Sequence, residues 1–257
     1  MGIVPSGGGR NIQEARKPAI LERGGVNVAV LSYSSVFIPG IFPAGESKPG
    51  IATVAVNTSY EIPGNIIYAP GAPPRIVTIP KREDKERMEE EVREAKKQAD
   101  IVVVNWHWGL TRYANSYGSG LPIEDSLFYV LNYQEDLGRV AIDAGADLII
   151  GHHPHRLQGM ELYRGKLICY SLGILTMPFL MGENFGEETL IVKGYIDRKS
   201  KQLKKATLIP VRVPSENLQP YVVPIEKADA IVSELGRLSK KYGTKFHIEE
   251  NEIVVST

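Results

Sequence analysis

The sequence predicts a mixed α/β fold built around a parallel sheet, and three observations predict it. Two short apolar runs, Ile101–Val104 and Leu148–Ile150, each follow an aspartate and each lead within a few residues to glycine and histidine. Runs of this length are typical of strands that are buried on both faces of a parallel sheet. Between them, apolar residues recur at helical spacing until Gly145, a residue type that commonly ends helices. Strand, helix and strand together predict a right-handed βαβ unit.

The N-terminal part predicts a short helix, a hairpin and a long irregular segment. Asn11 is suited to cap the start of a helix, and Glu14, three residues later, to return the hydrogen bond. Gly24 and Gly25 separate two apolar segments and can adopt the positive φ angles of a two-residue hairpin turn. Prolines and glycines recur throughout Ser34–Pro80, which argues against continuous regular structure and favours a lid or a binding loop.

The middle of the chain predicts one amphipathic helix and then a β-rich half. Lys81–Ala99 places its apolar residues on one stripe and its charges elsewhere, as in a helix with one solvated face. Arg164 and Gly165 separate two short apolar segments, which predicts a second hairpin. Residues 188–196 and 206–213 alternate between apolar and polar side chains, the pattern of further strands.

The C-terminal end predicts a helix followed by a small hairpin. Apolar residues recur at helical spacing over residues 228–238, and two short apolar segments lie within residues 245–255. We expect a principal domain over residues 1–215, with residues 216–257 packed on the same domain.

The charge balance and the single cysteine exclude several classes of protein. Thirty basic and thirty acidic residues give a formal net charge of zero, so no overall field attracts the chain to nucleic acid. No window approaches the ~18 consecutive apolar residues of a membrane span, and the N-terminus lacks the pattern of a signal peptide. Cys169 is the one cysteine, and we expect it to be buried and inert. We therefore expect a soluble protein, cytoplasmic by default.

Four of the five histidines follow the two apolar runs that open this section. His107 ends the first run, and His152, His153 and His155 follow the second. Because parallel strands end at the same edge of a sheet, and because ligands of such sheets bind in the crevice beyond that edge, these side chains are expected to meet there.

Three of these histidines are candidate metal ligands. His153 and His155 stand two residues apart, so an extended chain would aim both in one direction, and Pro154 would stiffen the segment between them. His152 would then point the opposite way, which makes it the weaker candidate. A lone His107 would ordinarily be a packed core or surface residue, but the βαβ unit brings it to the same edge and favours a ligand role.

Imidazoles in this arrangement point to hydrolysis assisted by a divalent ion. Three of them resemble a mononuclear zinc site with water in the open position. With oxygen ligands added, two ions roughly 3.5–4 Å apart become possible, and such a pair can hold a water and an ester or phosphoryl oxygen together. Trp106 and Trp108 flank His107 and would face away from it in a strand, so we expect both in the core.

Three segments that surround these histidines resemble, in their order along the chain, successive motifs of the CapA capsule-synthesis family. They are Asn105–Gly109, Ala144–His155 and Tyr170–Gly173, and the resemblance extends over most of the chain from about Gly7 to Met177. The resemblance implies an association with poly-γ-glutamate capsule formation. It also implies the calcineurin-like metallophosphoesterase fold, a β-sandwich flanked by helices.

The resemblance gives the three histidines a role. His107, His153 and His155 correspond to metal ligands of the wider superfamily, and His107 is also the candidate catalytic residue. It implies a metal-dependent, phosphoesterase-like hydrolase that holds divalent manganese, zinc or iron and acts on a small-molecule or polymer substrate. If the chain follows the family in location, it acts outside the cytoplasm on a membrane anchor.

Several family motifs have no counterpart in the sequence. The Gly-Asp strand and the Asn-x-Glu and Asn-Asn-His segments, which supply acidic, amide and further histidine groups, do not occur. Leu110–Arg112 stands where an acidic residue commonly follows His-Trp-Gly, and Ile174 stands where the family has asparagine. The resemblance therefore implies a sandwich that is incomplete at its N-terminal half, with a partner chain as one source of the missing part.

Two other functions stay open beside the hydrolase. A non-catalytic fragment or binding module would need a partner chain to complete the metal site. A serine hydrolase centred on Ser171 is a distant third, because the sequence around it lacks the Gly-x-Ser-x-Gly elbow.

Overall fold

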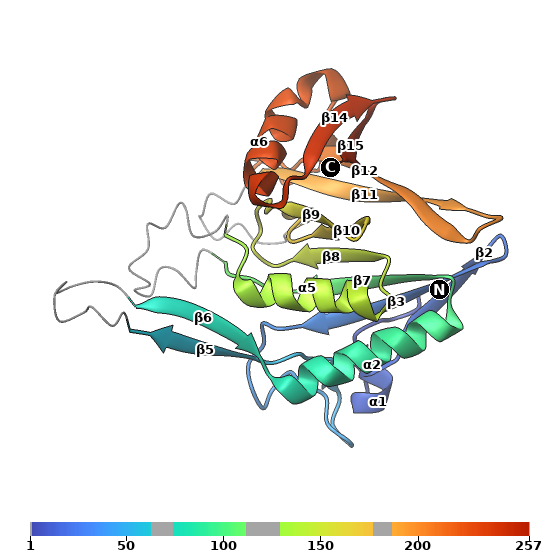
Figure 1. Cartoon of the computed structure of the whole chain (residues 1–257), viewed down its shortest axis with the longest axis vertical. Coiled ribbons are helices and arrows are strands. Elements are labelled where there is room, and N and C mark those ends of the chain that lie inside the picture. Colours follow the sequence, from blue (N-terminus) through green and yellow to red (C-terminus); the bar gives the residue numbers. More distant parts are fainter. Residues whose placement is uncertain (1, 63–73, 112–128, 177–186, 257) are drawn as a thin grey trace.

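A six-stranded mixed sheet lies at the centre of the fold. In the computed structural model, which describes residues 2–62, 74–111, 129–176 and 187–256, this sheet connects the two apolar runs of the sequence (Figure 1). Strands β3, β7, β8 and β10 are parallel neighbours, and β2 and β9 pair antiparallel at the edges. In spatial order the strands are β2 (Ala19–Arg23), β3 (Val26–Ser34), β7 (Ile101–His107), β8 (Leu148–His152), β10 (Lys166–Cys169) and β9 (Met160–Tyr163). The predicted strand–helix–strand unit with adjacent parallel strands is confirmed.

Two helices cover one face of this sheet. Helix α2 (Arg82–Gln98) contributes the predicted apolar stripe, with Met88 and Val92 fully buried, and α5 (Asn132–Ala144) ends at Gly145, which has a φ of 121°. Successive strand residues point to opposite faces of the sheet. Every second residue of β7 therefore packs under the helices. The buried residues of this core include Val102, Val104, Trp106, Ile149, Ile168 and Tyr170.

A second, antiparallel sheet packs against the other face. Its strands are, in spatial order, β11 (Glu188–Asp197), β12 (Gln202–Arg212), β15 (Glu252–Ser256) and β14 (Lys245–Glu249), with β13 (Tyr221–Val222) paired to β12. The core between the sheets joins residues of β8 and β10, such as Leu148 and Leu167, to Leu208 and Ile253 of the second sheet. Helix α6 (Asp229–Ser239) packs at the margin of this core through Ile231 and Leu235. The predicted mixed α/β architecture is confirmed.

The predicted short first helix is confirmed, but it is capped differently from the expectation. Helix α1 (Ile12–Arg16) begins after Asn11, whose side-chain oxygen accepts a hydrogen bond of 2.8 Å from the Glu14 backbone N–H. The Glu14 carboxylate does not return a bond to Asn11. It accepts one from the Arg10 backbone N–H at 3.0 Å instead, because it also forms an ion pair with the Arg10 guanidinium.

The segment from Ser34 to Pro80 contains more regular structure than its prolines predict. It contains the short strand β4 (Gly50–Ile51), which pairs with β1 (Gly8–Gly9) of the N-terminus. It also forms an antiparallel pair of β5 (Val56–Glu61) and β6 (Arg75–Pro80). The prediction of an irregular excursion is wrong here. Residues 56–61 and 75–79 contain no proline, so their backbone N–H groups are all available for the ladder.

The hairpins predicted elsewhere are confirmed. Gly24 and Gly25 take φ angles of 62° and 79° between β2 and β3, as a two-residue turn requires. Strands β9 and β10 form the second hairpin and β14 and β15 the last one. Among the described residues, no helix combines the length and the apolar character needed to cross a membrane.

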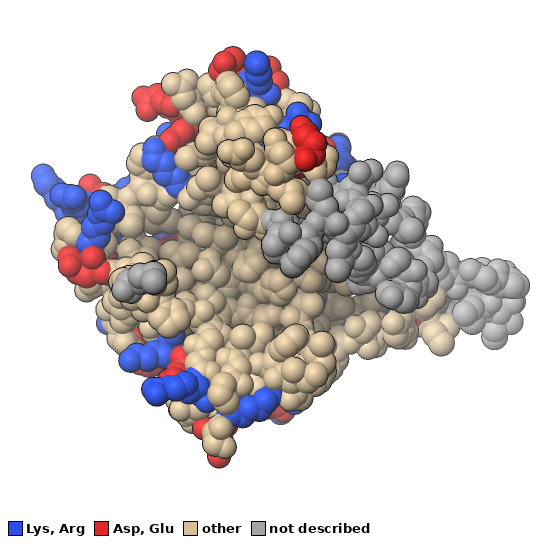
Figure 2. All heavy atoms as spheres, turned by 180° about the vertical axis from the view of Figure 1, so that it is seen from behind, with Lys and Arg blue, Asp and Glu red and all other residues tan. Residues whose placement is uncertain are grey.

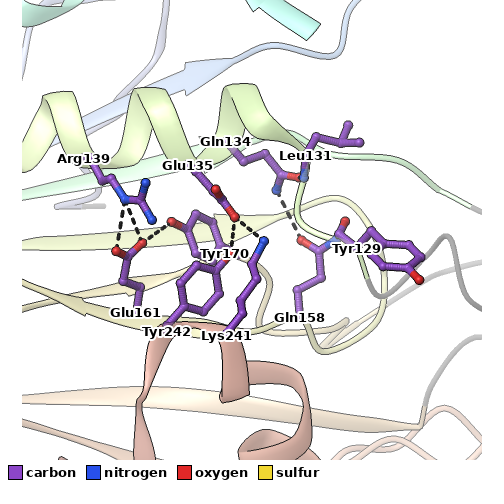
Figure 3. A network of polar contacts seen from close by, with 10 residues as sticks. All are labelled: Tyr129, Leu131, Gln134, Glu135, Arg139, Gln158, Glu161, Tyr170, Lys241 and Tyr242. Atoms are coloured by element: carbon purple, nitrogen blue, oxygen red, sulfur yellow. Dashed lines mark hydrogen bonds and ion pairs between the residues drawn. The ribbon is translucent and has the colours of Figure 1, made fainter. Parts of the chain in front are cut away.

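A polar network connects the C-terminal elements to α5 and to the central sheet (Figure 3). Glu135 of α5 accepts a hydrogen bond of 2.6 Å from the Tyr242 hydroxyl and pairs with the Lys241 ammonium. Both residues belong to the 3₁₀ helix η2 (Lys240–Tyr242), which follows α6 directly. A second 3₁₀ helix, η1 (Ile225–Lys227), precedes α6. The Ser239 hydroxyl accepts a hydrogen bond of 2.9 Å from the Met160 backbone N–H. These hydrogen bonds connect the C-terminal elements to β9 and α5. The domain boundary expected at residue 215 stays a prediction.

Candidate metal and ligand site at the histidine edge

The strand pairing brings the first two histidines together. Strands β7 and β8 run parallel, with His107 directly opposite His152 in the register. Their imidazole ring centres lie 5.2 Å apart. His107 and His152 therefore meet at the carboxyl edge of the sheet, where the sequence predicted that histidines would converge.

The turn after β8 brings the other two histidines to the same place. The ring centre of His153 lies 4.4 Å from that of His107, and the ring centre of His155 lies 5.8 Å from that of His153. All four histidines of the predicted edge thus form one cluster. The remaining histidine, His247, lies on β14 of the second sheet.

The route by which His153 and His155 arrive differs from the prediction. The sequence was interpreted as an extended segment, but His153 and His155 have φ angles of 109° and 59°, and the strand ends at His152. Residues other than glycine rarely adopt such angles, so the segment is a tight turn held by its surroundings. The prediction that His152 points to the opposite side is therefore wrong, because its ring lies beside that of His107.

Backbone contacts from β7 hold this turn in place. The Trp108 backbone N–H donates to the His152 carbonyl at 3.0 Å. Gly109 has a φ of 88°, and a methyl group on its Cα would lie 2.9 Å from the Pro154 ring. The Gly109 backbone N–H donates to the Tyr133 hydroxyl at 2.5 Å. The turn at Gly109 and the turn that carries His153 and His155 are thus packed directly on one another.

Two buried amides support the turn from α5. Gln134 is fully buried, and its Nε2 donates to Oε1 of Gln158 at 3.2 Å (Figure 3). Gln158 is itself 1% exposed, and its Nε2 donates to the Tyr129 carbonyl at 2.9 Å. Buried amides with satisfied hydrogen bonds rigidify the segments that they join. Neither glutamine was singled out from the sequence, because a single glutamine gives no local signal of burial.

The two tryptophans belong to the core, as predicted. Trp106 and Trp108 are both fully buried, and their rings stack with centres 4.9 Å apart. The Trp106 indole N–H donates to the Ser35 hydroxyl at 3.0 Å, and the Trp108 indole N–H donates to the Tyr170 carbonyl at 2.7 Å. Both indoles lie on the helix-covered face.

Burial keeps the histidine cluster uncharged at neutral pH. Burial, reinforced by the neighbouring His152 and His155, lowers the pKa of His107 to about 4. Burial and the other three rings lower the pKa of His153 to about 3. The pKa values of His152 and His155 are also lowered, in both cases chiefly by burial. Neutral imidazoles keep a nitrogen lone pair, which is the form that binds metal ions.

These pKa shifts predict how the metal-free protein responds to acid. Because histidine in an unfolded chain titrates near 6.5, the unfolded state takes up protons first, and the free energy of unfolding should fall as the pH drops below about 6.5. Imidazole chemical shifts in a chelator-treated sample should place the protonation of His107 near pH 4 and of His153 near pH 3. The urea-unfolded chain is the reference, and midpoints equal to those of the unfolded chain would contradict the burial of the cluster.

The donor set fits a divalent ion in part. Four neutral imidazoles supply nitrogen ligands of the kind that zinc, manganese and iron accept. Among the described residues, no three side chains of His, Cys, Asp or Glu converge closely enough to form a ready metal site. The four imidazoles therefore lie in one cluster, but among the described residues they are not arranged as a ready site for an ion. The ligand roles of His107, His153 and His155 stay a prediction.

A cavity of about 540 Å³ opens beside His107 and His152. Its wall includes Ser32 and Ser34 of β3 and Asn105 of β7. None of these three residues was given a role from the sequence, although Asn105 belongs to one of the family-like motifs and shares the face of His107 on β7.

The nucleophiles considered from the sequence are both enclosed. Cys169 is fully buried, and burial raises the pKa of its thiol well above the ordinary range. Ser171 is fully buried as well, and its hydroxyl oxygen accepts a hydrogen bond of 3.4 Å from the Gly173 backbone N–H. Leu110 and Thr111 follow the turn at Gly109, whereas residues 112–128, which include Arg112, lie outside the described residues.

Comparison with known proteins gives relatives that include two CapA proteins. The PGA biosynthesis protein CapA of Bacillus subtilis (strain 168) is 34% identical over 168 residues, which cover 65% of this chain and 33% of that protein. The capsule biosynthesis protein CapA of Bacillus anthracis is 32% identical over 167 residues, covering 65% of this chain and 31% of that protein. This chain thus spans about a third of the length of these relatives.

A solved structure of a phosphatase from Mycoplasma pneumoniae is similar over 76% of this chain and 57% of its own, with a TM-score of 0.40 and 11% identity, a likeness too weak to carry an argument. The family profile is more informative, because it matches residues 1–176 and includes every histidine of the cluster. The chain belongs to the family of bacterial capsule synthesis proteins described as PGA_cap.

Proposed function

We propose that this chain is a metal-dependent, phosphoesterase-like hydrolase module of a capsule-synthesis protein. The observation that carries the proposal is the convergence of His107, His153 and His155, buried enough to stay neutral, at the carboxyl edge of a parallel sheet. Open parallel sheets bind their ligands at that edge. The substrate would be a small molecule or a polymer that carries an ester or phosphoryl group.

Each histidine has a part in this proposal. His153 and His155 would hold the ion, since the packed turn fixes both rings, and His107 would approach it from β7 and face the substrate. A divalent ion bound there would polarise the scissile group and lower the pKa of a bound water. The fully buried amide of Gln134 would maintain the turn through Gln158.

Metal content provides the direct test. His153→Ala and His155→Ala should each weaken metal binding at least tenfold, because water in place of the lost imidazole holds the ion less tightly. Purified variants loaded with zinc or manganese would be desalted and their metal content per chain measured by elemental analysis. His107→Ala should reduce the metal content as well.

His247→Ala is the matched control. It removes one imidazole from the second sheet, away from the cluster, and should leave the metal content unchanged. Equal metal content in the His153→Ala and wild-type proteins would remove His153 from the site. Folding of every variant is checked by its thermal unfolding midpoint, so that loss of metal is not confused with loss of structure.

A second function is favoured by the donor set. Among the described residues, no three side chains of His, Cys, Asp or Glu form a ready metal site, which supports a binding module that a partner chain completes. Hydrolysis of a generic phosphate ester by the metal-loaded chain separates the two functions. Turnover that is lost in His107→Ala would support the hydrolase, whereas metal binding without turnover would support the binding module.

A further inference from the structure

A second cavity, of about 390 Å³, lies at the edge of the central sheet opposite to the histidine cluster. Its wall includes Asp100 and Asp147, which directly precede β7 and β8. Because β7 spans Ile101–His107, the length of that strand, roughly 20 Å, separates this cavity from the histidines. The cavity is therefore a separate site, and its volume falls within the roughly 300–1,000 Å³ typical of small-molecule sites.

Three lysines from three different elements line this cavity. Lys96 belongs to α2, Lys166 to β10 of the central sheet, and Lys201 to the turn before β12 of the second sheet. The helix layer and both sheets thus place ammonium groups around one space. Like charges repel one another at such short range, so a convergence of this kind needs counter-charges.

Asp147 supplies the first counter-charge and holds two of the lysines. Its Oδ1 accepts a hydrogen bond from the Lys166 ammonium at 2.7 Å. Its Oδ2 accepts one from the Lys96 ammonium at 2.7 Å and one from the Val102 backbone N–H at 2.9 Å. Both oxygens of this carboxylate therefore already have donors within the protein.

Asp100 holds the third lysine in the same way. Its Oδ1 lies 3.3 Å from the Lys201 ammonium nitrogen, and its Oδ2 accepts a hydrogen bond of 2.9 Å from the Asn27 backbone N–H. The Asp100 backbone carbonyl accepts a further bond of 2.6 Å from Lys96. The lysine ammonium groups are thus fixed in position around the cavity.

The lysines keep donors that these contacts do not use. An ammonium group has three N–H donors and no acceptor. With the described residues, Lys96 uses two of its donors, whereas Lys166 and Lys201 use one each. The described part of the lining thus combines three ammonium groups with two carboxylates whose oxygens are occupied. This arrangement favours a ligand that accepts hydrogen bonds and carries negative charge.

A basic turn borders the cavity on the side of the second sheet. Arg198 and Lys199 belong to the same β11–β12 turn as Lys201, and neither forms an ion pair with a residue that the structure describes. The Arg198 guanidinium lies against Gly24 of the β2–β3 turn. Figure 2 shows Lys and Arg side chains projecting at the left margin, on the side where the β11–β12 turn lies. Such a rim attracts anions towards the cavity.

We infer that this cavity binds the phosphate group of a small phosphorylated ligand, with Lys96, Lys166 and Lys201 as its donors. Phosphate fits the donor set better than a carboxylate does, because each of its three terminal oxygens can accept from a different ammonium group. A phosphate ion alone fills only part of the cavity, which leaves room for an organic group. The site is distinct from the proposed reaction centre, because the histidines lie at the other edge of the sheet.

Three anionic probes test the inference in chelator-treated protein at constant ionic strength. Backbone amide chemical shifts of Gly145 and Ala146, which line the cavity, report binding. Inorganic phosphate should bind saturably, and glycerol 3-phosphate should bind at least as tightly because the cavity accommodates its organic part. Acetate should bind at least tenfold more weakly than inorganic phosphate.

Lysine substitutions then assign the donors. Lys166→Gln and Lys201→Gln should each weaken phosphate binding about tenfold, as expected for a lost hydrogen bond to a charged group. Lys245→Gln on β14 makes the same change of charge at an exposed position of the second sheet, and this control should bind like the wild type. Thermal unfolding midpoints verify folding, and the Lys201 side chain is 48% exposed, so its removal leaves the core intact.

Any of three results would overturn the inference. They are acetate binding as tight as phosphate binding, glycerol 3-phosphate binding weaker than that of inorganic phosphate, and equal phosphate affinity in Lys201→Gln and Lys245→Gln. His153→Ala provides the separation from the proposed function, because it should leave phosphate binding in the chelator-treated protein unchanged. Loss of phosphate binding in that variant would place the anion at the histidine cluster and contradict a second site.

Discussion

Replacing Gly151 by alanine is expected to destabilise the fold by about 3 kcal/mol or more. Gly151 lies on β8 directly before the histidines, and an added Cβ would collide with the Tyr170 carbonyl oxygen and the Trp108 indole nitrogen. It would also lie 2.8 Å from the carbonyl oxygen of Cys169. To make room, the sheet must spread or the buried Trp108–Tyr170 hydrogen bond of 2.7 Å must break.

Urea unfolding followed by tryptophan fluorescence measures this effect. Gly236→Ala is the matched control, because Gly236 lies inside α6 and a Cβ there meets nothing within 4 Å. That variant should be more stable than the wild type by about 0.5–1 kcal/mol, the helix-propensity difference between alanine and glycine. Unfolding midpoints of Gly151→Ala within error of the wild type would show that β8 and β10 are not packed as described.

Replacing Asp147 by asparagine is expected to destabilise the fold by about 2 kcal/mol. The Asp147 carboxylate is 7% exposed and accepts hydrogen bonds from the Lys96 and Lys166 ammonium groups, both at 2.7 Å. It also accepts one from the Val102 backbone N–H at 2.9 Å. The substitution leaves two lysines facing a neutral group, and because both lysines are about one third exposed, solvent offsets part of the loss.

The same carboxylate gives the stability a pH dependence with a definite sign. Burial, the largest single influence, would raise the pKa of Asp147, but the hydrogen bonds from Lys166, Lys96 and Val102 together lower it. Its contribution is therefore fully present above the unfolded value near 3.8 and is lost as the pH falls through the lower folded value. The stability difference between wild type and Asp147→Asn should shrink in that range.

Asp143→Asn provides the comparison for this prediction. Asp143 pairs with Arg164 at 3.0 Å on the surface, with side chains 37% and 68% exposed. Exposed ion pairs contribute little, so the variant should differ from the wild type by less than about 0.5 kcal/mol. A loss as large in Asp143→Asn as in Asp147→Asn would argue against the special role of the buried carboxylate.

The sequence signals that succeeded were those that depend on local periodicity. The apolar run before His107 indicates a strand buried on both faces, and the apolar stripe of α2 indicates a helix buried on one face. Both elements formed as predicted. The strand pairing then followed from the topology of parallel sheets. The convergence of histidines was predictable for the same reason, since parallel strands end at one edge.

The details that failed depend on tertiary packing. Nothing local indicates that His153 and His155 take positive φ angles, because that conformation is maintained by Gly109 and Pro154 in contact across the site. The strands β5 and β6 were obscured by prolines that lie between or at the ends of the strands. Asn105 was quoted from the sequence only as part of a motif, because its place opposite Ser32 depends on the pairing of β3 with β7.

The adjacent residues Gln134 and Glu135 of α5 have a consequence for local stability. Gln134 holds the histidine turn through Gln158, whereas Glu135 holds Tyr242 and Lys241 of the C-terminal segment (Figure 3). One turn of α5 therefore holds both the histidine turn and the C-terminal segment. Local unfolding of either segment would loosen the part of α5 that holds the other. The histidine turn and the C-terminal segment are thus expected to exchange their amide hydrogens as one cooperative unit, although about 80 residues separate them in the sequence.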